Sequence, residues 1–227
     1  GTEANETALL LATYARRSDE VLALRNSYHG RSYGTIAVTG NRGWKNSSLS
    51  PLTVHYLHGT DRSHPAFAHL SDREYIDVCV ADLRDVLSTT APNVACLIAE
   101  PIQGVGGFVM PPDGLFAAYK EVLDEQGILF ISDEVQTGWG RTGTSFWGIG
   151  NHGVTPDMMT FAKGLGNGFA IGGVVARGDL MDALPANGVS TFGGNPISTA
   201  AANAGRLAMT LSKLEGVLEF RLSPTGR

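Results

Sequence analysis

The chain has 227 residues, of which 43% are hydrophobic, and carries 17 basic and 22 acidic residues for a net charge of −5. This composition is typical of a globular protein with a real core, and the absence of a basic block argues against nucleic-acid or anionic-membrane partners. No apolar stretch approaches a bilayer span, and the first six residues do not resemble a signal peptide. We therefore expect a cytoplasmic protein, not bound to a membrane, that acts on a small molecule.

Short apolar runs alternate with amphipathic stretches, as in repeated strand and helix units. The sequence predicts an α/β fold with a mostly parallel sheet and helices on both faces. The polar, His-rich residues 41–73 predict a long surface excursion. In chain order we expect a helix at 7–17, a strand at 21–25, a helix at 81–88, a strand at 94–99, a helix at 115–126, strands at 127–132, 158–161 and 172–176, and a helix at 197–214.

The two cysteines, Cys79 and Cys96, lie on a helix-like and a strand-like segment and form no C-x-x-C pair. Two such cysteines without a secreted disulfide pattern predict reduced, structural side chains.

Lys163 is one of only four lysines, and it ends the apolar run 157–163 just before the glycine-rich loop 164–168. A lysine in a semi-apolar cleft loses hydration of its charged form, so its pKa falls and its amine can attack a carbonyl. The alternative is a lysine that merely covers a strand end.

Two carboxylates also follow predicted strands. Glu100 and Asp133 precede Lys163 by about two and one strand-helix units, so all three are expected at one sheet edge, where such folds bind ligands. A buried Asp133 needs a positive partner, and a protonated heteroaromatic nitrogen beside a reactive lysine is the binding logic of pyridoxal phosphate. The alternative is that Asp133 or Glu134 pairs with Arg141 for structure alone.

Residues 1–5 stand immediately before a helical pattern and offer free backbone N–H groups and a hydroxyl at the positive end of a helix. Such a start suits a phosphate, although capping is the commoner purpose of a threonine there.

Four longer motifs give the pattern a family context. AEPIQGVGG (99–107), ISDEVQTGWGRTG (131–143), FAKGLGNG (161–168) and TFGGNP (191–196) occur in order and at family spacing. From Gly1 to about Glu215 the chain resembles the class III (ω-type) pyridoxal-phosphate aminotransferases, whose large domain has the fold of type I enzymes of this cofactor.

The resemblance assigns roles at the cofactor. Lys163 matches the lysine that holds pyridoxal 5′-phosphate covalently and moves a proton between the substrate and the cofactor. Asp133 matches the partner of the ring nitrogen. Val135 matches the residue on one ring face and Tyr28, followed by His29, the aromatic residue on the other.

Further positions follow from the same resemblance. Gly1 and Thr2 match phosphate-loop positions, Gln136 a side chain near the phenolic oxygen, and Glu100 a buried supporting acid. Thr191 matches a phosphate ligand that the neighbouring subunit donates, which implies a homodimer.

The substrate side carries two expectations. Arg31 matches a substrate-carboxylate arginine in some members, although a surface ion pair is a comparable interpretation. Val105 stands where members that use glutamate with 4-aminobutyrate or ornithine tend to have Glu, and together with the motifs at 146–148 and 191–194 it places the chain near the alanine-glyoxylate and 3-aminoisobutyrate-pyruvate branch.

The expected reaction is transfer of an amino group between an amino acid or ω-amino acid and a small 2-oxo acid such as pyruvate or glyoxylate. Two alternatives stay open. One is an inactive or merely cofactor-binding fragment, and the other is an aminomutase or racemase on the same fold. The resemblance implies that residues 1–215 form an incomplete large domain, that 216–227 are an unpatterned tail, and that a C-terminal small domain is missing.

Two other site types are disfavoured. Gly138 to Gly143 fits G-x-G-x-x-G, but the following residues show no helical stripe, so a nicotinamide site lacks its context. His55, His58, His64 and His69 lack cysteine partners and ordered ligand spacing, so we expect no metal site.

Overall fold

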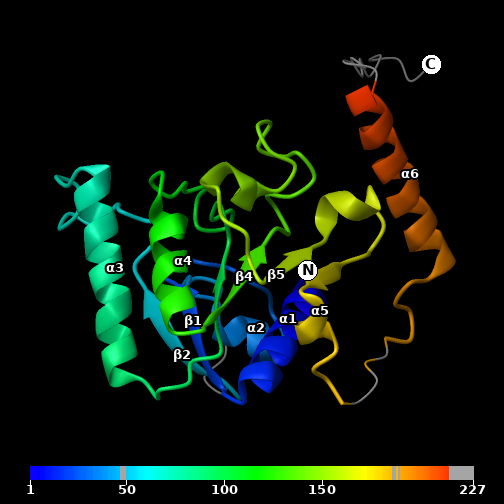
Figure 1. Ribbon diagram of the computed structural model, residues 1–227. Coiled ribbons are helices and arrows are strands. Elements are labelled where there is room, and N and C mark those ends of the chain that lie inside the picture. Colours follow the sequence, from blue (N-terminus) through cyan, green and yellow to red (C-terminus); the bar gives the residue numbers. More distant parts are fainter. Residues whose placement is uncertain (47–49, 186–187, 189, 215–227) are drawn as a thin grey trace.

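The computed structural model describes the chain except residues 47–49, 186–187, 189 and 215–227, with side chains described up to residue 206. A six-stranded sheet in the order β2-β1-β3-β4-β5-β6 forms its centre (Figure 1). Neighbouring strands are parallel except for the last pair, in which β6 runs antiparallel to β5. The strands are β1 (Glu20–Leu24), β2 (Thr53–Leu57), β3 (Cys96–Ala99), β4 (Leu129–Asp133), β5 (Met158–Phe161) and β6 (Gly173–Ala176).

Successive side chains of each central strand enter two different cores, because neighbouring residues of a strand point to opposite faces of the sheet. On β1, Leu22 and Leu24 join the core beneath α3 (Asp72–Thr89) and α4 (Leu115–Glu125). Val21 and Ala23 join the core beneath α1 (Thr2–Arg16) and α5 (Gly178–Met181). The sheet is therefore buried on both sides, and its strands read as near-continuous apolar runs.

The remaining helices lie at the margins of this sandwich. The short α2 (Tyr33–Ala37) packs against α1. The 3₁₀ helices are η1 (Gly148–His152), which contacts α4, and η2 (Lys163–Gly166), which contacts α6. The long α6 (Pro196–Leu214) extends away from the sheet, as Figure 1 shows at the right. No helix in the described ranges combines the length and apolarity needed to cross a bilayer.

The predicted α/β class, with a mostly parallel sheet and helices on both faces, is confirmed. The interpretation of 41–73 as surface excursion alone was wrong, since it contains β2. In the described part of the chain this edge strand pairs only with β1 and is only partly buried. Its residues therefore do not form the continuous apolar run by which the other strands were predicted. Residues 216–227 lie outside the described part of the chain.

Helix starts were predicted too late. The helix expected from residue 81 begins at Asp72, where Ser71 and Glu74 form a capping box. The helix expected from residue 7 begins at Thr2 and follows the N-cap Gly1. The first turn of α1 is largely polar, which hides its start. The helix α3 already has the buried Tyr75, Ile76 and Cys79 before residue 81, an apolar stripe that the prediction overlooked. The helix α2 was not predicted at all, and its capping Ser32 and Thr35 belong to a five-residue element too short to show a period.

Both cysteine thiols are free and buried, Cys79 on α3 in one core and Cys96 on β3 in the other. Burial raises the pKa of the Cys79 thiol to about 11, as expected for packed side chains without an activating base.

Candidate active site

A cavity of about 750 Å³, called the lysine cavity below, opens at the carboxyl ends of β1, β3, β4 and β5. Its walls are the first turn of α1, residues 28–30 after β1, Glu100 after β3, Asp133 with residues 135–136, and residues 162–163 with 168–172. The predicted convergence of Glu100, Asp133 and Lys163 on one sheet edge is confirmed. The cavity lies where the chain order reverses between β1 and β3, the usual ligand position in open α/β sheets.

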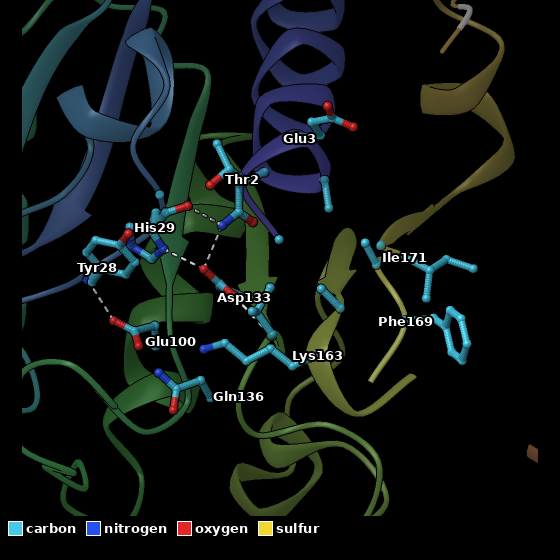
Figure 2. Close-up of a pocket in the computed structure, with 18 of the residues that line it drawn as sticks. Thr2, Glu3, Tyr28, His29, Glu100, Asp133, Gln136, Lys163, Phe169 and Ile171 are labelled. Carbon is cyan, nitrogen blue, oxygen red and sulfur yellow. Dashed lines mark hydrogen bonds and ion pairs between the residues drawn. The ribbon is translucent and has the colours of Figure 1, made fainter. Parts of the chain in front are cut away.

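Lys163 lies two residues after the end of β5, at the start of η2, and has a left-handed backbone conformation with φ of 39°. Its side chain points toward Glu100 and Gln136 (Figure 2). Desolvation lowers the pKa of Lys163, against the opposing influence of the Asp133 and Glu100 carboxylates. A lysine that still meets solvent but has a lowered pKa has a larger fraction of free amine, as an attack on a carbonyl requires.

The other lysine side chains that the structure describes are engaged elsewhere. The Lys45 amine donates to the Ala37 carbonyl at 3.2 Å and lies over the Tyr56 ring. Lys120 forms an ion pair with Asp124 one helical turn away. Among these three lysines, Lys163 alone lacks a hydrogen-bond partner in the described part of the chain, so its amine is available to a ligand.

Asp133 is buried, with only 3% of its surface exposed, and is held by three donors. Its Oδ2 accepts hydrogen bonds from His29 Nδ1 at 2.8 Å and Asn5 Nδ2 at 2.7 Å, and its Oδ1 accepts one from the Val135 amide at 3.1 Å. A carboxylate offers about four acceptor sites. One therefore remains for a donor inside the cavity, which fits a protonated ring nitrogen.

Asn5 is the site residue that sequence reasoning missed. Its side-chain amide donates to both Asp133 and the His29 carbonyl at 2.8 Å, and its Oδ1 accepts from Thr160 Oγ1 at 2.6 Å. It is 1% exposed, on the same helix face as Ala8 and Leu9. A polar residue on an otherwise apolar stripe was a signal available in the sequence, because a buried amide needs partners.

Glu100 is also buried, and each of its oxygens accepts one backbone N–H, from Tyr28 at 2.8 Å and from Gly104 at 3.0 Å. Desolvation, with a smaller contribution from the Asp133 charge, raises the pKa of Glu100 to about 7, and the charge of His29 opposes this rise. Glu100 thus ties two loops together and can hold a proton near neutral pH.

The two residues expected on the faces of an aromatic ring lie at the same cavity. Tyr28 and Val135 both line the lysine cavity, and Trp44 supports Tyr28 in an edge contact with ring centroids 5.6 Å apart. Gln136 lines the cavity beside Gly104, where a Cβ atom would lie 2.4 Å from the Gln136 amide nitrogen. The absence of a side chain at residue 104 is what allows Gln136 to lie there.

The N-terminus of α1 faces the lysine cavity. Gly1 is the N-cap and has no side chain to cap the helix, whereas Thr2 is already the first residue of α1 and does not occupy the N-cap position. Gly1, Thr2 and Glu3 line the cavity, and the backbone N–H of Asn5 already donates to the Gly1 carbonyl at 2.9 Å. The earlier amides of this turn suit an anion such as phosphate.

Two predicted residues lie elsewhere. Arg31 is exposed and lines neither the lysine cavity nor the adjoining one described below. Thr191 is exposed in the turn before α6 and is also absent from both walls. Neither residue meets the other site residues within the described chain.

The competing interpretations of Asp133 and of the glycine motif do not hold. Neither Asp133 nor Glu134 pairs with Arg141 among the described ion pairs, and both carboxylates bind other donors. Residues 138–143 form consecutive turns and open no helix, so they lack the setting of a dinucleotide fingerprint. His55 bonds Glu20, and His58 bonds Arg25.

A second cavity of about 500 Å³ adjoins the first and shares Val135, Gln136 and Lys163 with it. Its other apolar walls come from Ile102, Phe108, Met110 and Trp139. Lys163 therefore stands between a cavity that contains the carboxyl groups of Glu100 and Asp133 and a more apolar one.

Comparison with known proteins gives a consistent result. The family profile described as "Aminotransferase class-III" matches residues 1–214. The chain is 40% identical over 203 residues to "Alanine--glyoxylate aminotransferase 2 homolog 2, mitochondrial" of Arabidopsis thaliana, covering 88% of this chain and 41% of that protein. It is also 40% identical over 205 residues to the acetylornithine aminotransferase of Corynebacterium efficiens, covering 90% and 46%.

A solved structure agrees with the sequence relatives. The PLP-bound amine transaminase from an uncultivated Pseudomonas species superposes with a TM-score of 0.85 at 31% identity, covering 95% of this chain and 52% of that chain. The chain thus spans less than half the length of the two curated relatives and about half of this solved structure.

Proposed function

Because the chain belongs to the class-III aminotransferases, we propose that the lysine cavity binds pyridoxal 5′-phosphate and that the protein moves an amino group between an amino acid or ω-amino acid and a small 2-oxo acid. One observation carries this proposal. A lysine amine of lowered pKa and a buried aspartate with a spare acceptor site line the same cavity at the carboxyl ends of parallel strands.

When bound, the cofactor supplies an electron-withdrawing ring that stabilises negative charge at the substrate α-carbon. Lys163 provides the amine that holds the cofactor and then carries a proton to and from that carbon. His29 and Asn5 fix the orientation of the Asp133 carboxylate by donating to its Oδ2. Its remaining acceptor site would then hold a proton on the ring nitrogen.

The remaining walls position the ring. Tyr28 and Val135 would pack on its two faces, and Gln136 would lie near its phenolic oxygen. The N-terminal turn of α1, with Gly1 and Thr2, would bind the phosphate through backbone N–H groups and the threonine hydroxyl. Glu100 would support this edge of the site by joining the two loops that it bonds.

The functional form is proposed to be a homodimer in which Thr191 completes the neighbouring site. Two large apolar side chains next to it support this, since Phe192 is 82% and Ile197 is 67% exposed. Exposed apolar side chains of this size commonly mark interfaces. Residues 1–215 would form the cofactor-binding domain, and a cytoplasmic location stays a prediction.

The proposed amino acceptor is pyruvate or glyoxylate, and the alanine-glyoxylate relative and Val105 support this branch. The apolar second cavity offers room for a substrate side chain next to Lys163, and Arg31 stays the proposed carboxylate partner. The acetylornithine relative is equally similar and makes transfer to 2-oxoglutarate the second candidate. Turnover of the full-length protein with 2-oxoglutarate far above that with pyruvate and glyoxylate would establish the second candidate. Racemisation or migration of the amino group without transfer would establish the racemase or aminomutase alternative.

Trapping of the cofactor tests the site directly. The protein is incubated with pyridoxal phosphate, reduced with borohydride and digested, and the labelled lysine is located by mass spectrometry. Selective labelling of Lys163 over Lys45, Lys120 and Lys213 is expected. Lys163→Ala should abolish turnover and the label while retaining part of the phosphate affinity, and Lys120→Ala serves as the surface control. Unchanged turnover in Lys163→Ala would refute the assignment.

The same experiment decides the fragment alternative. Selective labelling of the 227-residue chain means that its own residues assemble the site. Labelling confined to the full-length protein means that the chain is only part of a site.

A further inference from the structure

Glu134 is a fully buried carboxylate for which the proposed chemistry has no use. It follows Asp133 at the end of β4, and it faces the opposite side of the sheet because neighbouring residues alternate. Asp133 points to the lysine cavity, whereas Glu134 bonds the amide of Ile149, a member of the core beneath α4. Among the described ion pairs none contains Glu134.

Four donors satisfy this carboxylate instead of a cation. Oε2 accepts from Thr137 Oγ1 at 2.5 Å and from the Gly148 amide at 2.8 Å. Oε1 accepts from the Ile149 amide at 2.8 Å and from Ser132 Oγ at 3.3 Å. The chain approaches so closely that a Cβ atom on Gly148 would lie 2.5 Å from the Thr137 Cβ. The bonds therefore close residues 134–149 into a tight loop.

The loop places an aromatic cluster behind the reactive lysine. Trp147 precedes Gly148 directly and packs edge-on against Trp139, with ring centroids 5.0 Å apart. Both indoles contact Phe161, at 5.8 Å from Trp147 and 5.5 Å from Trp139. Phe161 ends β5 two residues before Lys163. Glu134 is thus connected to Lys163 through one continuous set of packed groups.

The backbone is strained at two residues of this set, Trp139 and Lys163. Trp139 and Lys163 adopt left-handed conformations with φ of 67° and 39°, which side chains other than glycine rarely take. Trp139 meets the residue that follows Lys163, since its ring would lie 3.4 Å from a Cβ atom placed on Gly164. Strained residues persist only where their surroundings hold them. The Glu134 bonds and the aromatic cluster provide that support.

We propose that Glu134 is a positioning residue that fixes Trp147 and Trp139 against the Lys163–Gly164 turn and thereby directs the Lys163 amine into the lysine cavity. What that amine does when directed there rests on the function proposed above. The adjacent carboxylates Asp133 and Glu134 then serve one site from opposite faces of the sheet, the first by direct contact and the second through the loop.

Replacement of Glu134 by Gln tests this because only a carboxylate can accept all four bonds. In glutamine a carbonyl oxygen still accepts at one position, whereas the other position is taken by an NH₂ nitrogen, which donates and does not accept. Placed at either oxygen position it would oppose a backbone N–H, of Gly148 in one orientation and of Ile149 in the other. One end of the loop should therefore come loose while the side-chain volume stays the same.

Two measurements report the result in the 227-residue chain, whose tryptophans are Trp44, Trp139 and Trp147. Without cofactor, acrylamide quenching of tryptophan fluorescence follows Trp139 and Trp147, with the half-exposed Trp44 as a constant background. With pyridoxal phosphate, the rate at which a borohydride-reducible bond forms at Lys163 follows the direction of the amine. In Glu134→Gln we expect stronger quenching and bond formation slowed about ten-fold, as for the loss of one charge-assisted hydrogen bond.

Glu125→Gln is the matched control, since it removes the same charge from an exposed helix end where Glu125 pairs with Arg84, and it should behave as the wild type. Thr137→Val removes one donor and keeps both amide bonds, so it should give a smaller change in the same direction. If Glu134→Gln does not fold, Thr137→Val becomes the test of the proposal. Wild-type quenching and a wild-type rate in Thr137→Val would then overturn it.

A folded Glu134→Gln protein with wild-type quenching and a wild-type rate at Lys163 also overturns it, whatever its thermal stability. Failure of the wild type to form the reducible bond, in the full-length protein as well, counts against the proposed function instead. The quenching comparison without cofactor still decides the role of Glu134 in that case.

Discussion

Replacing Glu100 by Gln removes an ionisable group from the wall of the lysine cavity and should change how the stability of the protein depends on pH. Burial raises the pKa of Glu100 from 4.5 to about 7. Between these values the unfolded chain has lost the proton while the folded protein still holds it, so the folded state binds more protons. Stability from this group is therefore fully present below about pH 4.5 and is lost as the pH rises through about 7.

The size of the effect follows from the same numbers. A pKa that rises from 4.5 to about 7 corresponds to about 3 kcal/mol, at about 1.4 kcal/mol for each tenfold change in proton affinity. Glu100 is 4% exposed, so little solvent screening reduces this value. Gln also loses one acceptor toward the Tyr28 or Gly104 amide, at about 1 kcal/mol. The cost of the lost acceptor is independent of pH. The change of the free energy of unfolding with pH therefore reports only the ionisation of Glu100.

Urea unfolding of the wild type and of Glu100→Gln at several pH values between 4 and 8 measures the difference. The free energy of unfolding of the variant relative to the wild type should rise by about 3 kcal/mol from pH 4 to 8, while contributions from His58 and His152 cancel. Glu125→Gln, at an exposed carboxyl that pairs with Arg84, should show no such rise. Parallel curves for the wild type and Glu100→Gln would refute the reasoning that burial keeps Glu100 protonated.

Two other substitutions test the support of the site. Asn5→Ala removes two donated bonds around Asp133 and leaves the Thr160 hydroxyl without its acceptor. It should weaken pyridoxal phosphate binding about ten-fold, measured by absorbance titration. Unchanged affinity would show that His29 and the Val135 amide suffice to orient Asp133. Gly148→Ala places a Cβ atom 2.5 Å from the Thr137 Cβ and should lower the free energy of unfolding by about 1–3 kcal/mol, measured in urea. Gly178→Ala, where space is open, should be neutral or stabilising, because Ala favours a helix and restricts the unfolded chain. An equal loss in both variants would refute the steric explanation.

Much of the fold and the first group of site residues could be predicted from the sequence alone. Apolar runs such as 128–132 and 158–161 are long enough to mark buried strands, and a polar residue that ends such a run must lie at the sheet edge. Glu100, Asp133 and Lys163 obey this rule, and the structure brings all three to one cavity. The local sequence pattern is enough to place these residues, because the carboxyl ends of parallel strands all lie at the same edge of the sheet.

Elements that depend on partners distant in sequence could not be found in this way. The strand β2 is stabilised by its pairing with β1, which lies more than twenty residues earlier in the chain. Asn5 meets Asp133 across 128 residues, and its role as a donor follows only from the packing of α1 over β4 and β5.

Glu134 shows the same limit within a single motif. The sequence places it beside Asp133 but does not tell which of the two carboxylates faces the cavity or which donors meet the other. Tertiary structure decides this, because the Gly148 and Ile149 amides become available only once η1 has packed against α4. The sequence by itself thus determined which residue types stand at the strand ends, whereas the burial of each charge and its hydrogen-bond partners were decided by the packing of segments that lie far apart along the chain.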